Sequence, residues 1–139
     1  MVPQRVVSRA YAAFAWLIAG IAVLHMATTW RLTSASSFTK VWFFGAGVAM
    51  AQTAALNLLH RVHGRSVVSL ARVTRASNAP MLALATVAGV VTGASIAQLV
   101  VMLGSIAALL VLSFSKSALR SHSDDSPLSP TAASHPTRS

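Results

Sequence analysis

The fold is decided by residues 80–115, PMLALATVAGVVTGASIAQLVVMLGSIAALLVLSFS, a run of 36 residues with no charged side chain and no proline after its first residue. As one α-helix this run would be about 54 Å long, whereas the hydrocarbon core of a membrane is about 30 Å thick. Two membrane-crossing helices joined by a tight turn fit that thickness better. The turn is expected at residues 94–98, ASIAQ, because Gln98 has the most polar side chain of the run. A single tilted helix is the alternative.

Two further apolar runs precede this one, and each is long enough to cross a membrane. The chain is 55% hydrophobic and 9% charged, against about 25% charged residues in a typical soluble domain. Its only acidic residues are Asp124 and Asp125, so residues 1–120 contain no carboxylate side chain. We therefore predict an all-α integral membrane four-helix bundle over residues 1–120. The predicted spans are about 10–29, 41–60, 80–94 and 98–115.

The basic residues predict the orientation of this bundle. Eight of the eleven lie at residues 5–9, 61–75 and 116–120, on the N-terminal side of the first span, between the second and third spans, or directly after the fourth; only Arg31 and Lys40 lie between the first and second. The positive-inside rule then places both termini in the cytoplasm, and the alanine-rich, short-loop design points to a bacterial cytoplasmic (inner) membrane. A three-span chain would put Lys116 and Arg120 outside. The first span resembles a signal peptide in its basic start, but it is too long and lacks a small-x-small cleavage site, so we expect it to be retained.

The segments outside the spans have two different compositions. Between the second and third spans, Arg65, Ser69, Arg72 and Ala76 share one helical face, which predicts a short amphipathic helix on the inner membrane surface. Ser77 or Asn78 is then expected to cap the third span, with Pro80 in its first turn. Residues 121–139 are rich in Ser, Pro and Thr and are predicted to be disordered. The four predicted contacts with anionic lipid or with a partner are Arg61, Arg65, Arg72 and Arg75.

Small residues recur at every fourth position in the third span, which includes one GxxxG motif. Small side chains let two helix backbones approach closely inside lipid, where no hydrophobic force drives helices together. This stripe is therefore a candidate packing face, either within the bundle or against a second membrane protein. Its members are Ala85, Gly89, Gly93 and Ala97.

Polar side chains gather on one face of the second span. Thr53, Asn57 and His60 follow one another at i, i+4 and i+7, and a polar group in lipid must find a hydrogen-bond partner. We expect interhelical hydrogen bonds here; the alternative is a polar path or pocket along this span. The candidate residues are Gln52, Thr53, Asn57, His60 and Thr86.

Histidines offer the only groups near the spans that titrate close to neutral pH. His25 and His60 lie at different expected depths, so the pair cannot supply both axial ligands of one haem. We predict no metal and no cofactor, with His25 as a lone titratable group in its span. The chain has no cysteine, which excludes thiol chemistry and cysteine metal sites.

These observations weigh against an enzyme and favour a protein that binds other membrane components. No nucleophile, base or carboxylate pair stands at a telling spacing, and the net charge of +9 is spread over short loops rather than gathered for nucleic acid. The sequence therefore predicts a non-enzymatic accessory, assembly or interaction subunit of a membrane complex. Its expected partners are the lipid bilayer, anionic lipids at the inner surface and another membrane protein or a second copy. The alternative is a homo-oligomeric pore or carrier that works without carboxylate coupling.

Overall fold

The computed structural model describes residues 3–119. This part of the chain forms four α-helices and one short 3-10 helix, joined by short loops. Within this part there is no β-strand, so the all-α prediction is confirmed. The tail predicted at residues 121–139 lies outside the described residues. The helices are α1 Gln4–Thr29, α2 Ser37–His63, α3 Val68–Val91 and α4 Ile96–Leu112, and the 3-10 helix η1 is Lys116–Ala118.

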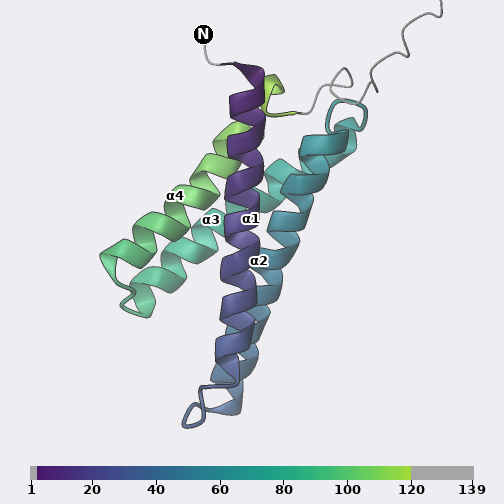
Figure 1. Ribbon diagram of the computed structural model, residues 1–139. Helices are drawn as coiled ribbons and strands as arrows, with labels where there is room; N and C mark the ends of the chain where they lie inside the picture. Colours follow the sequence, from purple (N-terminus) through teal and green to yellow (C-terminus); the bar gives the residue numbers. More distant parts are fainter. Residues whose placement is uncertain (1–2, 120–139) are drawn as a thin grey trace, which may run out of the picture.

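The helices form two antiparallel hairpins. α1 pairs with α2 over the most extensive interface of the molecule, and α3 pairs with α4. α1 also packs against α4, and α2 against α3, so each helix touches its two neighbours in an up-and-down arrangement. Figure 1 shows that the far ends of α1 and α2 extend well past the turn between α3 and α4.

Helix length and composition differ between the two hairpins. α1 and α2 contain 26 and 27 residues, and both are long and apolar enough to cross a membrane. These helices contain the predicted spans 10–29 and 41–60. α4 is also apolar but has only 17 residues, and α3 begins with a basic segment that includes Arg72 and Arg75.

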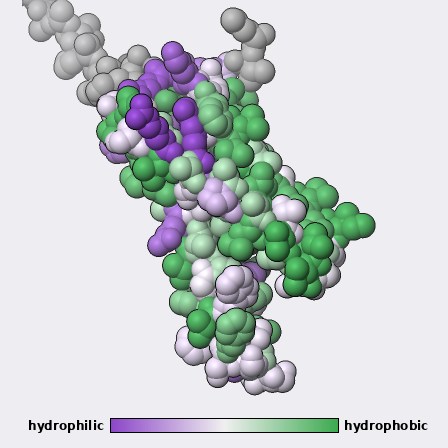
Figure 2. All heavy atoms as spheres, turned by 180° about the vertical axis from the view of Figure 1, so that it is seen from behind, coloured by the Kyte–Doolittle hydropathy of each residue, from purple (hydrophilic) through white to green (hydrophobic). Residues whose placement is uncertain are grey.

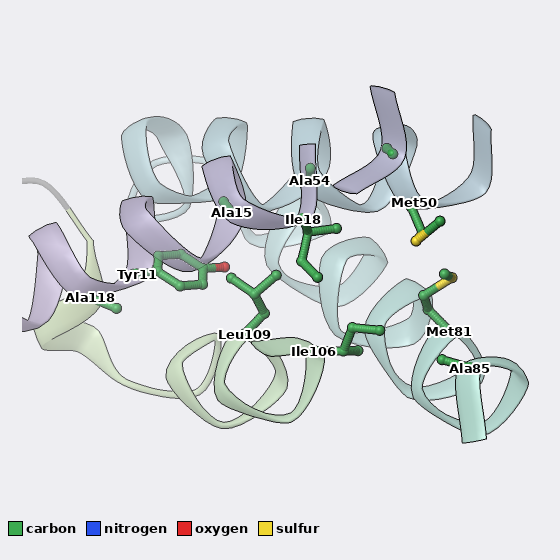
Figure 3. Close-up of a cluster of buried hydrophobic side chains, with 11 residues drawn as sticks. Tyr11, Ala15, Ile18, Met50, Ala54, Met81, Ala85, Ile106, Leu109 and Ala118 are labelled. Carbon is green, nitrogen blue, oxygen red and sulfur yellow. The ribbon is translucent and has the colours of Figure 1, made fainter. Parts of the chain in front are cut away.

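The core is a narrow seam along the bundle axis. On α1, Tyr11, Ala15, Ile18 and Ala22 fall at i, i+4, i+7 and i+11, which places all four on one helical face. Figure 3 shows this face meeting side chains from the other three helices. The side chains that these helices contribute are Met50 and Ala54 of α2, Met81 and Ala85 of α3, and Ile106 and Leu109 of α4.

Two glycines allow helices to approach closely. A Cβ at Gly47 would lie 2.6 Å from Cγ of Met26, so this glycine brings α2 against α1. A Cβ at Gly89 would overlap the side chain of Leu99, so Gly89 seats α4 on α3. Both contacts are internal to the bundle.

The turn between the last two helices begins before the predicted position. α3 ends at Val91 and α4 begins at Ile96, so the turn occupies residues 92–95 and the predicted turn at residues 94–98 lies two to three residues too far along the chain. Gln98 is not in the turn but in the first turn of α4. There its polar side chain closes a capping box with Ser95, in which each side chain accepts a hydrogen bond from the other residue's backbone N–H. Gly93 adopts φ +65° in the turn, a conformation that glycine accepts without strain. The small-residue stripe is therefore interrupted: Ala85 and Gly89 are buried on α3, and Ala97 belongs to α4.

The predicted inner-surface helix is not a separate element. α3 runs without interruption from Val68 to Val91, so the amphipathic segment and the third span are one helix. Pro80 lies inside this helix rather than in its first turn, where it removes one backbone hydrogen bond. The side chain of Asn78 does not cap a helix, because it is fully buried and hydrogen-bonded to Asn57.

The outer surface is apolar over most of its length. Large hydrophobic side chains are exposed on all four helices. In Figure 2, apolar residues cover the side of the visible face where the α3–α4 hairpin protrudes, and strongly hydrophilic residues gather at the upper end of the bundle.

Candidate functional site

A buried pair of asparagines joins α2 to α3. Asn57 Nδ2 donates to Asn78 Oδ1 at 2.7 Å, and Asn78 Nδ2 donates to Asn57 Oδ1 at 3.0 Å. Asn57 Nδ2 also donates to the carbonyl of Thr53 at 2.7 Å, which fixes the orientation of the amide because a carbonyl can only accept. Both side chains are completely buried. The two carboxamides thus satisfy each other away from any solvent.

Tyr11 brings α1 into the same network. Its hydroxyl donates to Asn57 Oδ1 at 2.7 Å and lies 3.0 Å from Nδ1 of His60. Because the single hydroxyl proton is used on Asn57, the hydrogen bond to His60 requires a proton on Nδ1 of the imidazole. Asn57 therefore makes four hydrogen bonds that tie three helices together. We call Tyr11, Asn57, His60 and Asn78 the polar clamp.

The clamp contains one unpartnered atom. Among residues 3–119, Nε2 of His60 is the only buried side-chain nitrogen or oxygen without a hydrogen-bond partner. The ring edge that carries Nε2 lies against Gly64, where a Cβ would overlap the imidazole and stand 2.8 Å from Nε2. Gly64 has φ −64° and ψ −14°, which any residue can adopt. Glycine is needed here for space and not for backbone conformation.

Replacing Gly64 with alanine is expected to lower the free energy of unfolding by about 1–2 kcal/mol, because the added methyl group displaces the His60 ring from Tyr11. Reversible unfolding in mixed detergent micelles, followed by tryptophan fluorescence, measures this loss. The matched control is Gly104→Ala on α4, where a Cβ meets nothing within 4 Å and alanine should be neutral or stabilising. Equal stability of the two variants would contradict the assigned role of Gly64.

The remaining predicted polar residues separate into two groups. Thr53 is buried and donates to the carbonyl of Ala49, so the predicted face of Thr53, Asn57 and His60 does point into the bundle. Gln52 and Thr86 are exposed on the outside of α2 and α3. Thr86 satisfies its hydroxyl on the carbonyl of Leu82. Gln52 lines a groove between α2 and α3, whereas the printed hydrogen bond of Thr86 stays within its own helix, so only Thr53, Asn57 and His60 of the five candidates lie on the buried polar face.

Three of the four predicted surface arginines bind carbonyl groups of other elements. Arg61 Nε donates to the carbonyl and the hydroxyl of Ser8, both at 3.0 Å. Arg65 donates to the carbonyls of Lys116 and Leu119. Arg61 holds the end of α2 to the start of α1, and Arg65 holds the loop after α2 to η1 and to the residue that follows it. Their structural use was not predicted, because it depends on which carbonyls the fold brings within reach.

Arg75 fastens the end of α4. Its Nε and Nη2 donate to the carbonyl of Ser113 at 3.1 and 3.0 Å, and its guanidinium lies 4.5 Å from the centroid of the Phe114 ring. Ser113 follows the last residue of α4, where unpaired carbonyls attract a cation. Arg72 is exposed at the surface.

His25 lies far from the clamp. Its ring stacks on Phe43 of α2, with centroids 3.6 Å apart, near the α1–α2 loop. Within residues 3–119 no three His, Cys, Asp or Glu side chains are grouped to hold a metal ion. The titratable side chains that the described part of the chain does bring together are those of Tyr11 and His60 in the polar clamp.

Comparison of the chain with models of known protein families, with curated proteins and with solved structures gives no match in any of the three.

Proposed function

We propose that this protein is an integral membrane bundle with both termini in the cytoplasm, in a bacterial cytoplasmic membrane. The first support is that only 22% and 28% of the most apolar windows of α1 and α2 are buried. A core helix of a soluble protein of this length would be mostly covered, so these exposed apolar faces match a hydrocarbon solvent.

The distribution of charge supports the same placement. Most of the described basic residues lie at the end of the bundle that contains the start of α1, the end of α2 and η1. The other end has only Arg31 and Lys40. Lys and Arg favour the cytoplasmic side of a membrane. The basic residues at the first end are Arg5, Arg9, Arg61, Arg65, Arg72, Arg75 and Lys116.

Within the membrane, we infer that the protein is a non-catalytic accessory or interaction subunit. The observation that carries this proposal is the complete internal use of Asn57, whose four hydrogen bonds leave it no capacity for a substrate or ion. A clamp of this kind holds helices in fixed positions and presents constant outer faces. Such faces are what a partner membrane protein would recognise.

The alternative, a homo-oligomeric pore or carrier, is favoured by one observation, the exposed position of Gln52 on α2. A passage would then run between copies of the chain rather than through one copy, because Asn57 and Asn78 close the interior. Gln52→Leu should change solute flux into liposomes under this alternative and leave it unchanged under the accessory role.

The accessory role predicts a defined complex. The chain, extracted in mild detergent and studied by native mass spectrometry, is expected to carry the same larger membrane protein in a fixed ratio across preparations. A tagged, unrelated four-helix membrane protein processed in parallel reports non-specific recovery. Recovery of the chain alone, whether as one copy or as several, would contradict the accessory role.

A further inference from the structure

Three cationic residues from distant parts of the sequence meet at η1. Gln4 Nε2 and Arg65 Nη2 both donate to the carbonyl of Leu119, at 3.3 and 3.4 Å, and Arg65 Nη2 also donates to the carbonyl of Lys116 at 3.3 Å. Arg5 directly follows Gln4, and α1 packs against η1. The start of α1, the loop after α2 and η1 thus each contribute one exposed cation to the same corner of the bundle. We call Arg5, Arg65 and Lys116 the η1 cluster.

The positive charge at this end of the bundle exceeds what the chain itself can neutralise. The hydrogen bonds of Arg65 to the carbonyls of Lys116 and Leu119 end on neutral groups, which do not compensate the charge of a guanidinium. Asp124 and Asp125 are the only acidic residues of the chain, so they can neutralise at most two of the seven basic residues at this end. Because like charges held close together repel one another, an anion from outside the chain would stabilise this corner.

The chemistry of that anion follows from the apolar side chains beside the cluster. Val6, next to Arg5, is 53% exposed, and Phe114, two residues before Lys116, is 62% exposed. In the membrane placement proposed above, both lie on the bilayer side of the cations. A free phosphate or a nucleic acid makes no use of exposed apolar groups, whereas a phospholipid joins a phosphate directly to hydrocarbon chains. Guanidinium and ammonium groups bind phosphate oxygens through charge-assisted hydrogen bonds.

We propose that the η1 cluster binds the headgroup phosphate of an anionic phospholipid in the cytoplasmic leaflet, with the acyl chains against Val6 and Phe114. A zwitterionic headgroup carries an ammonium group that the three cations repel, so the cluster selects a lipid of net negative charge. Of the four arginines that the sequence predicted to meet lipid, only Arg65 belongs to this site. The proposal rests on the membrane placement given above and does not depend on the accessory role.

Native mass spectrometry of the full chain in mild detergent, titrated with phosphatidylglycerol or with phosphatidylcholine of identical acyl chains, measures the affinity for each lipid. The wild-type chain is expected to bind phosphatidylglycerol about tenfold more tightly. Lys116→Gln and Arg65→Gln should each reduce this preference about threefold, and Arg65→Lys, which keeps the charge, should retain most of it. The matched control is Arg31→Gln, which removes one charge at the opposite end of the bundle and should leave the preference unchanged. Because the Lys116 side chain is exposed, its variant tests the site even if Arg65→Gln does not fold.

Inorganic phosphate and glycerophosphoglycerol, the water-soluble headgroup, test whether the site requires a lipid. Neither should displace phosphatidylglycerol at equal concentration, because neither can contact Val6 or Phe114. Equal affinities for the two lipids, a preference that survives both Lys116→Gln and Arg65→Gln, an equal loss in Arg31→Gln, or displacement by either soluble anion would overturn the proposal while leaving the membrane placement intact. A chain that stays in the supernatant after ultracentrifugation without detergent would refute the placement itself, and the lipid site with it.

Discussion

Replacing Asn57 with leucine is expected to lower the free energy of unfolding by about 3 kcal/mol, the largest loss we foresee for a single substitution. Leucine has a similar size but leaves the Asn78 amide buried without a partner and removes the acceptor for the Tyr11 hydroxyl. The free energy of unfolding in mixed micelles, from far-ultraviolet circular dichroism during titration with a denaturing detergent, measures the loss. Gln52→Leu, which removes an exposed carboxamide from the same helix, is the matched control.

A double substitution separates the clamp from simple loss of packing. When Asn57 and Asn78 are both replaced with leucine, no buried carboxamide remains unpaired, so the double variant should be more stable than the sum of the two single losses predicts. Additive losses would show that the two asparagines do not act as a pair.

Cysteine labelling should give an all-or-none map of the orientation. Ser34→Cys in the loop between α1 and α2 is expected to react with a membrane-impermeant thiol reagent in intact cells. Ser66→Cys, in the loop between α2 and α3, should react only after the membrane is permeabilised. The expected difference arises because these exposed loops lie at opposite ends of the bundle and the basic residues favour the cytoplasm.

The same approach tests whether the chain crosses the membrane an even number of times. Ser117→Cys in η1 should behave like Ser66→Cys, and the wild-type chain supplies the unlabelled control because it contains no cysteine. Reaction of Ser117→Cys from outside intact cells would contradict the proposed position of the C-terminal end.

The elements that the sequence predicted well are those with the strongest local pattern. The positions of α1 and α2 follow from uninterrupted apolar runs, and the inward face of Thr53, Asn57 and His60 follows from helical spacing. The turn near Gly93 was misplaced because Gln98 has two possible uses, as a turn residue or as the third residue of a capped helix. Composition alone does not distinguish them.

The partners of the polar face could not be predicted, because they depend on how the helices pack. Asn78 was expected to cap a helix because it precedes Pro80, but proline is tolerated inside α3, and the helix continues through both residues. The hydroxyl of Tyr11 reaches Asn57 across the α1–α2 interface, and no spacing in the sequence indicates this contact, because the two residues are 46 positions apart. The outward position of Gln52 likewise became clear only once the buried seam of α2 was known.

The unequal helices have a consequence for the lipids around the protein. α1 and α2 are about 39 and 40 Å long, whereas α4 is only about 26 Å long. In the membrane placement proposed above, lipid chains beside α4 would have to compress or splay to keep its ends hydrated, whereas α1 and α2 are longer than the hydrocarbon thickness and would tilt or extend beyond it. So placed, the bundle would deform the bilayer unequally on its two sides, and the resulting elastic strain would favour regions where the membrane is already thin or where a neighbouring protein covers α4.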